Sequence, residues 1–199
     1  MCGKGMMVVF EGIDGSGKTT IAIRLAKQLA EFGLKTLYTH EPYSAQLREV
    51  FNNFSIFYEL PPDFEVLYMA LDRAHHVHNV VEQFLNQGFI VIMDRYIYSS
   101  IAYQGALGVD LNWIQLVNSV FPRPDLALYL RVSLDTALSR IRLSKRIDKW
   151  KYFEYVERLR KAIEIYEMLV DMGVLRVVDG ERTIETVLRE CLDLVLKYL

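Results

Sequence analysis

Residues 6–20 read Met-Met-Val-Val-Phe-Glu-Gly-Ile-Asp-Gly-Ser-Gly-Lys-Thr-Thr, and this stretch decides the fold class. From Gly12 to Thr19 it matches the pattern G-x-x-x-x-G-K-[ST] at every required position. An apolar run of strand type precedes the match, and apolar residues at helical spacing follow it. Glycines let backbone N–H groups close around phosphate oxygens, and a helix N-terminus favours negative charge. The stretch therefore predicts a phosphate-binding loop, or P-loop, between a strand and a helix.

All residues of this loop are candidates for binding ATP: Gly12, Ile13, Asp14, Gly15, Ser16, Gly17, Lys18, Thr19 and Thr20. Lys18 would reach the β- and γ-phosphates, and the Thr19 hydroxyl would ligate Mg²⁺, the one expected cofactor. Lys18 lies outside the apolar pattern, so its side chain is expected to face solvent in the loop. The alternative is a glycine-rich turn with an incidental lysine, which the flanking strand and helix disfavour.

The rest of the chain alternates between short apolar runs and longer segments of helical periodicity. With residues 6–10, the predicted strands are 35–38, 89–93, 126–132 and 175–178. Helices are predicted over 21–32, from a cap at Asp63 toward Gly88, over 152–172 and over 183–198. This order predicts an α/β fold, the three-layer P-loop NTPase fold, with a five-stranded parallel sheet, helices on both faces and a short lid.

Length, charge and cysteine content narrow the class of protein. The chain has 199 residues without a linker-like segment, which predicts one domain over 1–199. Its net charge of −2 gives no reason to expect a nucleic-acid partner. No apolar run approaches the ~20 residues of a membrane span, and no signal peptide is recognisable, so a cytoplasmic protein without a membrane partner is expected. Cys2 and Cys191 are expected to be free thiols, with Cys191 in the core.

A P-loop alone does not separate a kinase from a GTPase switch or an ATP-driven motor. The guanine-reading pattern Asn-Lys-x-Asp is missing from the sequence, which disfavours a GTPase switch. The third predicted strand instead ends in Asp94-Arg95, at the sheet edge where ligands of such folds bind. Asp94 suits Mg²⁺, and the planar fork of Arg95 suits a phosphate; an Asp–Arg ion pair at a strand end is the alternative.

The run from Asp94 to Gly105 resembles the Asp-Arg-Tyr…Ser…Ala-Tyr-Gln-Gly signature of thymidylate kinases. Residues 71–77, Leu-Asp-Arg-Ala-His-His-Val, are similar to that family's Ala-Asp-Arg-Ala-x-His segment. Shorter matches follow in the family's order along nearly the whole chain: Glu41-Pro42, Pro124-Asp125-Leu126, Ile147-Asp148-Lys149 and Val178-Asp179-Gly180.

The resemblance implies roles for individual residues. Arg95, helped by Arg48, would hold the acceptor phosphate, and Asp14 would accept a hydrogen bond from the sugar 3′-hydroxyl. Arg73 would contact a thymine carbonyl and Tyr103 would stack on the ring. The full set of substrate-binding candidates is Asp14, Arg48, Met69, Arg73, Arg95, Ser99, Ser100, Tyr103 and Gln104. His75, His76 and His78 are expected to be surface or pocket-lining histidines, because no Cys, Asp or Glu completes a set of metal ligands around them.

Residues 140–151 form the densest basic stretch, located where thymidylate kinases carry a lid over ATP. A solvated helix face and a nucleic-acid patch are the alternatives, and the acidic balance disfavours the second. One subgroup of the family has an arginine in the P-loop where this chain has Gly15, so the lid is expected to supply that charge. Arg140 would pack near the adenine, and Arg142 or Arg146 would move onto the phosphates.

The expected reaction is transfer of the γ-phosphoryl group of ATP to dTMP, with Lys18, Arg95, Asp14, Arg142 and Arg146 as catalytic candidates and Thr19 and Asp94 as metal ligands. A kinase for another nucleoside monophosphate or for a deoxynucleoside is the nearest alternative, and a P-loop ATPase module is a more distant one. The resemblance also implies a homodimer.

Overall fold

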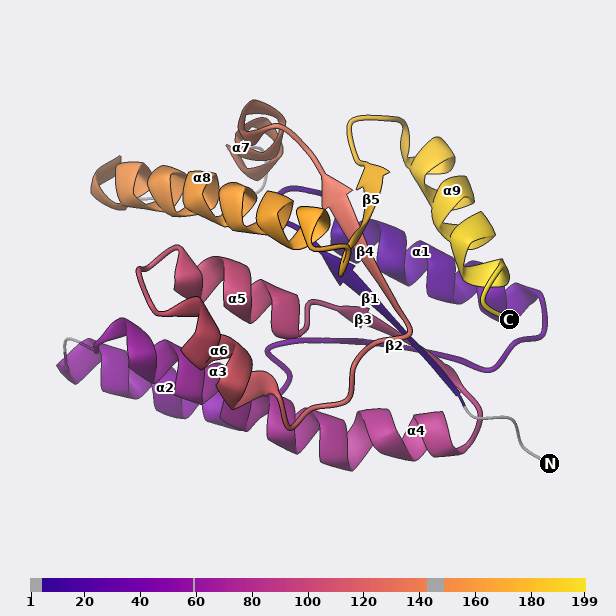
Figure 1. Cartoon of the computed structure of the whole chain (residues 1–199), viewed down its shortest axis with the longest axis horizontal. Coiled ribbons are helices and arrows are strands. Elements are labelled where there is room, and N and C mark those ends of the chain that lie inside the picture. Colours follow the sequence, from indigo (N-terminus) through magenta and orange to yellow (C-terminus); the bar gives the residue numbers. More distant parts are fainter. Residues whose placement is uncertain (1–4, 59, 143–148) are drawn as a thin grey trace.

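The computed structural model describes residues 5–58, 60–142 and 149–199. Figure 1 shows a central twisted sheet with helices on both of its faces. Its strands lie in the order β2-β3-β1-β4-β5, and every neighbouring pair is parallel. Their bounds are β1 Met6–Glu11, β2 Thr36–His40, β3 Ile90–Asp94, β4 Leu126–Arg131 and β5 Arg176–Asp179. The predicted five-stranded parallel sheet is confirmed, and strand ends differ from the predicted ones by no more than two residues.

Alternating side chains of the strands divide the core between the two faces of the sheet. Met6, Val8 and Phe10 point to one face, where α1 (Lys18–Glu31) and α9 (Ile184–Leu196) cover them. Met7 and Val9 point to the other face, under the remaining large helices. Because both faces are covered, the strands read as continuous apolar runs.

The helices of the second face come from the middle of the chain. They are α2 (Ala45–Phe57), α3 (Pro62–His76), α4 (Glu82–Asn86), α5 (Ile97–Gly105), α6 (Leu111–Asn118), α7 (Leu134–Arg142) and α8 (Lys149–Asp171). In Figure 1, α8 lies beside α5 at the left of the molecule, and α2 and α3 lie together below them. The patterns of the sequence predicted α1, α8 and α9 but not α2, α5, α6 or α7.

The helix predicted from Asp63 toward Gly88 exists, with two differences. It consists of α3, a π-helical turn η1 (Val77–Val81) and α4. Its N-cap is Pro61, and Pro62 is the first helical residue, so the capping role expected of Asp63 was wrong. Pro62 fits because its missing N–H is one that a first helical residue leaves unpaired, while Asp63 lies in the first turn, where the helix dipole favours a carboxylate.

Two predictions about buried side chains had opposite outcomes. Cys191 is a free cysteine in the core, as expected. His76 was expected at the surface or in a pocket, but its side chain is fully buried, with Nε2 2.7 Å from the Thr39 hydroxyl and Nδ1 3.4 Å from Glu41. Burial of a polar ring is tolerated there because both ring nitrogens have partners. None of the described helices is long and apolar enough to cross a membrane.

Candidate active site

The P-loop connects β1 to α1 and follows the backbone conformation that its glycines allow. Gly12, Gly15 and Gly17 have φ of 141°, 80° and 93°, values that side chains disfavour. A Cβ at Gly15 would also lie 2.5 Å from the carbonyl oxygen of Ala137, so α7 packs directly on the loop. Position 15 therefore accommodates glycine and leaves no room for the arginine that one subgroup of thymidylate kinases has there.

Lys18 is the first residue of α1 and is buried, which corrects the expectation that it faces solvent. Its Nζ donates to the carbonyl oxygen of Ile13 at 3.1 Å, which folds the side chain back over the loop. Burial, together with the nearby positive charge of Arg95, lowers the pKa of Lys18 to about 8. Desolvation outweighs the attraction of the nearby Asp94 and Asp14, and a polyphosphate in the loop would favour the charged form of the ammonium.

Asp94, at the end of β3, lies opposite Phe10 in the sheet register and next to the start of α1. Its Oδ2 accepts a hydrogen bond from the Thr19 hydroxyl. Its Oδ1 is buried and has no hydrogen-bond partner in the described part of the chain. A carboxylate with one unused oxygen beside a hydroxyl fits Mg²⁺, which takes few protein ligands and several phosphate or water oxygens.

Arg95 follows β3 and points along the P-loop. Its Nη2 lies 2.5 Å from Oδ1 of Asp14, and its Nη1 donates to the Ser99 hydroxyl at 3.2 Å. The guanidinium lies over the ring of Tyr103, 4.9 Å from the ring centroid, and the Tyr103 hydroxyl accepts from the Asp14 amide at 2.8 Å. Arg95 and Tyr103 therefore connect Asp14 of the P-loop to the end of β3 and to α5.

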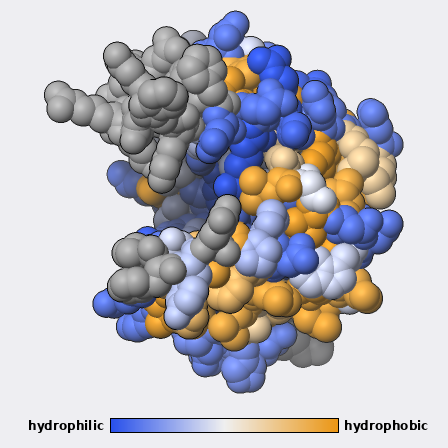
Figure 2. All heavy atoms as spheres, turned by 90° about the vertical axis from the view of Figure 1, so that its left-hand side faces the viewer, coloured by the Kyte–Doolittle hydropathy of each residue, from blue (hydrophilic) through white to orange (hydrophobic). Residues whose placement is uncertain are grey.

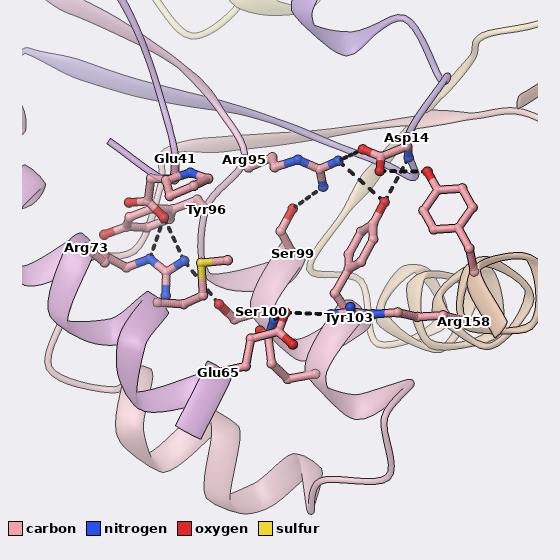
Figure 3. Close-up of a pocket in the computed structure, with 14 residues that line it drawn as sticks. Asp14, Glu41, Glu65, Arg73, Arg95, Tyr96, Ser99, Ser100, Tyr103 and Arg158 are labelled. Carbon is pink, nitrogen blue, oxygen red and sulfur yellow. Dashed lines mark hydrogen bonds and ion pairs between the residues drawn. The ribbon is translucent and has the colours of Figure 1, made fainter. Parts of the chain in front are cut away.

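A cavity of about 260 Å³ opens beside this cluster, between α3, α5 and α8 (Figure 3). The face seen in Figure 2, which is the left-hand side of Figure 1, is hollowed, and hydrophilic atoms border the hollow. Eight of the nine substrate-binding candidates line the cavity: Asp14, Met69, Arg73, Arg95, Ser99, Ser100, Tyr103 and Gln104. Residues up to 90 positions apart in sequence thus meet around a single cavity.

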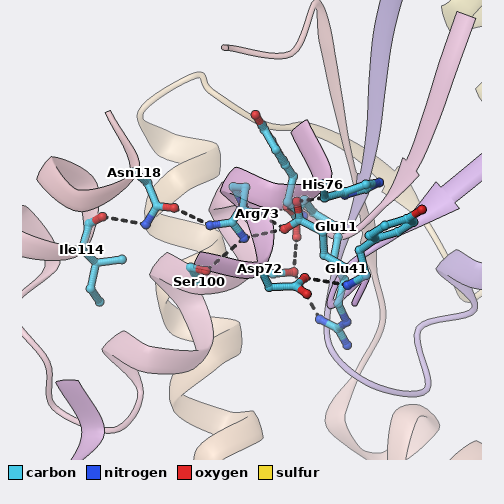
Figure 4. A network of polar contacts seen from close by, with 12 residues as sticks. Glu11, Glu41, Asp72, Arg73, His76, Ser100, Ile114 and Asn118 are labelled. Carbon is cyan, nitrogen blue, oxygen red and sulfur yellow. Dashed lines mark hydrogen bonds and ion pairs between the residues drawn. The ribbon is translucent and has the colours of Figure 1, made fainter. Parts of the chain in front are cut away.

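The far end of the cavity from the P-loop is formed by Arg73, whose side chain is buried and whose three guanidinium nitrogens each contact a protein oxygen (Figure 4). Its Nε donates to Glu41 at 2.8 Å, its Nη2 donates to Ser100 at 3.2 Å, and its Nη1 donates to Asn118. Its guanidinium also lies 5.3 Å from the ring centroid of Tyr96. These contacts fix a planar donor group at the wall of the cavity.

On the other side of the P-loop, α7 and the segment after β5 border a second cavity of about 220 Å³. Arg140 spans its wall, with Nη1 donating to the carbonyl oxygens of Gly15 and Ser16 at 3.3 Å and Nη2 donating to Gly180 at 3.1 Å. The P-loop therefore separates two cavities, with the acceptor candidates on one side and Arg140 on the other.

Comparison with known proteins agrees with this arrangement. A family model described as thymidylate kinase matches residues 10–191. The chain belongs to the thymidylate kinase family. A probable thymidylate kinase of Pyrococcus horikoshii is 39% identical over 203 residues, covering 96% of each chain. A probable thymidylate kinase of Staphylothermus marinus is 36% identical over 200 residues, covering 98% of this chain and 96% of that one.

A bacterial relative supports the same family. The thymidylate kinase of Xylella fastidiosa is 35% identical over 195 residues, covering 98% of this chain and 88% of its own. The family is one of P-loop nucleoside monophosphate kinases, so this chain is a phosphotransferase, and nothing in the comparisons favours a P-loop ATPase module.

One predicted residue lies apart from this cavity, and part of the predicted lid cannot be placed relative to it. The guanidinium of Arg48 donates to the carbonyl oxygen of Pro42 at 3.0 Å on an exposed part of α2, and Arg48 is not among the residues that line the cavity. Of the predicted lid over 140–151, residues 143–148 lie outside the described residues, and Arg146 is among them. The backbone of α7 ends at Arg142, whose side chain also lies outside what the structure describes.

The structure brings six further residues to the cavity that the sequence did not suggest for it: Glu41, Pro42, Glu65, Tyr96, Tyr155 and Arg158. The Tyr155 hydroxyl donates to Asp14 at 2.8 Å, and Arg158 pairs with Glu65 at 2.6 Å across the mouth of the cavity (Figure 3). Gln104 donates to the same carboxylate of Glu65 at 3.0 Å. Glu41 and Tyr96 were part of the matched motifs, but nothing local marks Tyr155 or Arg158.

Proposed function

We propose that this chain transfers the γ-phosphoryl group of ATP to dTMP, giving dTDP and ADP. One observation carries the proposal: a single cavity joins Arg95, at the edge of the P-loop, to Arg73, at its opposite end. The first arginine suits an acceptor phosphate and the second suits the carbonyl edge of a base. The cavity between them, of about 260 Å³, lies near the lower end of the roughly 300–1,000 Å³ typical of small-ligand sites.

The acceptor would bind with its phosphate on Arg95 and its base toward Arg73. Tyr103 would stack on the base, and Ser100 and Gln104 would face its polar edge, so that no polar atom of the base is buried without a partner. Met69 lines the same cavity from α3 and would pack against the ring. The 3′-hydroxyl would donate to Asp14, whose Oδ2 already accepts from Tyr155 in the free protein.

ATP would bind with its phosphates in the P-loop and its adenine beside Arg140. Lys18 would turn from the carbonyl oxygen of Ile13 to the β- and γ-phosphates, whose negative charge would raise the lowered pKa of its ammonium. Thr19 and Asp94 would hold Mg²⁺. When bound, Mg²⁺ would neutralise negative charge on the phosphates.

The residues present are sufficient for this reaction without a general base. A nucleoside monophosphate is largely dianionic at pH 7, because its second pKa is about 6, so the attacking oxygen needs no proton removed. Catalysis then depends on bringing two anions together and on neutralising the transferring phosphoryl group, for which Lys18 lies in the P-loop and Arg95 contacts Asp14 of the same loop. Arg142 or Arg146 of the lid would add charge when ATP is bound.

A homodimer in the cytoplasm is the proposed form of the protein. Leu67 and Leu71 lie one helical turn apart on α3 and are more than half exposed, as are Leu116 and Val120 at α6. Neighbouring exposed apolar side chains of this kind are typical of the core of a protein–protein interface. Light scattering should give about twice the chain mass of 23.2 kDa, and a Leu67→Glu/Leu71→Glu variant should give the monomer mass. A monomeric wild-type protein would contradict the proposal.

The experiment that tests the reaction measures ADP formation with dTMP, dUMP, dCMP, AMP or thymidine as acceptor. We expect ADP formation to depend on dTMP and to be at background with thymidine, which lacks the phosphate. Arg95→Ala should raise KM for dTMP with little change in KM for ATP, whereas Arg73→Ala should reduce the preference for dTMP over other pyrimidine monophosphates. ADP formation that is independent of every acceptor would overturn the proposal.

A further inference from the structure

Glu11 is a buried carboxylate that has no direct part in the reaction proposed above. It is the last residue of β1, its exposed fraction is 0%, and it is not among the residues that line the acceptor cavity. Burying a carboxylate costs free energy even when it is well hydrogen-bonded, and burial raises the pKa of Glu11 to about 7. A side chain needed only to fill space at this position could be neutral.

Three donors converge on the Glu11 carboxylate. The backbone N–H of Tyr96 donates to Oε1 at 2.9 Å, and the hydroxyls of Ser99 and Tyr166 lie 2.5 and 3.0 Å from Oε2. An ionised carboxylate accepts from all three donors, whereas an amide or a protonated carboxyl group presents a donor to one of them. The charge of Glu11 therefore decides the direction of the hydrogen bonds around it.

Arg95, the residue between β3 and Tyr96, is held by two backbone hydrogen bonds, one of which ends on Glu11. Arg95 has φ of 73°, the one positive φ at a non-glycine residue in the described part of the chain. Its own N–H donates to the carbonyl oxygen of Phe10 at 2.9 Å, and the next N–H, of Tyr96, donates to Glu11. A left-handed conformation at a non-glycine residue is strained, so it persists only where neighbouring contacts hold it. Both contacts come from the end of β1.

The side chain of Arg95 is held by the same carboxylate through Ser99. Nη1 of Arg95 donates to the Ser99 hydroxyl at 3.2 Å, and that hydroxyl donates its own proton to Glu11 at 2.5 Å. The Ser99 hydroxyl has one proton, and it donates that proton to the Glu11 carboxylate. Its oxygen therefore remains free to accept a hydrogen bond from Arg95. The negative charge of Glu11 also attracts the guanidinium across a buried site.

We propose that Glu11 is a positioning residue that aims the Arg95 guanidinium at the acceptor phosphate, through the Tyr96 amide and the Ser99 hydroxyl. This inference rests on the acceptor-phosphate role proposed for Arg95. Glu11 would touch neither substrate, and its removal should affect only the part of acceptor binding that passes through Arg95.

The test compares dTMP with thymidine, which shares the base and the sugar but has no phosphate to reach Arg95. Calorimetry on Glu11→Gln should show Kd for dTMP raised by about tenfold, the effect of one hydrogen bond to a charged group, and Kd for thymidine changed by less than about twofold. Glu41→Gln is the matched control, because Glu41 is also buried but orients Arg73 at the base end. It should weaken binding of both ligands by similar factors.

If Glu11→Gln disturbed the fold in general, it would weaken the binding of thymidine and dTMP alike, and that result would overturn the inference. An unchanged Kd for dTMP would also overturn it. Ser99→Ala interrupts the same relay in a second way and should reproduce the selective loss if Glu11→Gln does not fold. In an Arg95→Ala background, Glu11→Gln should add no further selective loss. If Arg95→Ala itself leaves dTMP binding unchanged, the role proposed for Arg95 fails; if only Glu11→Gln does, the inference alone fails.

Discussion

The raised pKa of Glu11 should make the stability of this protein fall as the pH rises. A carboxyl group with an ordinary pKa of 4.5 and a folded-state pKa of about 7 binds its proton more tightly in the folded state. Between these two values the folded protein retains a proton that the unfolded chain has lost, so the free energy of unfolding decreases with pH and levels off above about 7. At about 1.4 kcal/mol per pH unit, the loss amounts to about 3 kcal/mol.

Glu11→Gln removes this titration and isolates it from every other group. The charged and titratable groups near Glu11 include Lys18 of α1, Arg95 after β3, Tyr98 of α5 and Tyr166 of α8. Urea unfolding should be followed by circular dichroism between about pH 5 and pH 8. Over that range the free energy of unfolding of the wild type should fall by about 3 kcal/mol more than that of Glu11→Gln. An effect of the substitution that does not depend on pH cancels from this comparison.

Glu31→Gln is the control for the loss of one negative charge, because the Glu31 side chain is 63% exposed at the end of α1. If the wild-type and Glu11→Gln stability curves remain parallel from acid to neutral pH, the reasoning about Glu11 is refuted. If the two curves diverge as described, the ionised Glu11 lowers the free energy of unfolding at neutral pH, as expected of a residue that serves a function in the site.

Three further predictions concern other parts of the site and the core. Lys18→Met, which keeps most of the buried volume, should reduce turnover to less than about a tenth with the urea midpoint nearly unchanged, and retained turnover would contradict the role of Lys18. Arg142→Ala or Arg146→Ala should lower kcat by about 100-fold with little change in KM for ATP, and the idea fails if both single variants and their double variant keep wild-type kcat. Because burial raises the pKa of Cys191 to about 12, a Cys2→Ser variant should react with a thiol reagent at pH 8 only after unfolding, and rapid labelling of the native protein would disagree.

Local patterns were enough to predict the five-stranded parallel sheet and eight of the residues that line the cavity beside Arg95. The P-loop pattern specifies a strand, a glycine-rich turn and a helix in succession, and each of the other strands is an uninterrupted apolar run. The motifs that place Arg73, Arg95 and Tyr103 are carried by consecutive residues, so their chemistry could be read without knowing where they meet. The helices α5, α6 and α7 are short, and their apolar residues were not periodic over enough turns to be recognised.

Long-range contacts decided what no local pattern could. Lys18 was expected to face solvent and His76 to lie at the surface or in a pocket, but both are buried. Their burial depends on elements that are distant in sequence. Tyr155 and Arg158 reach the cavity only because α8 packs along α5, about 50 residues earlier in the chain. Glu11 reads as one residue at the end of a strand. The hydrogen bonds to its buried carboxylate come from residues 85 to 155 positions away, the most distant being Tyr166, because burial and the direction of hydrogen bonds are properties of the packed structure.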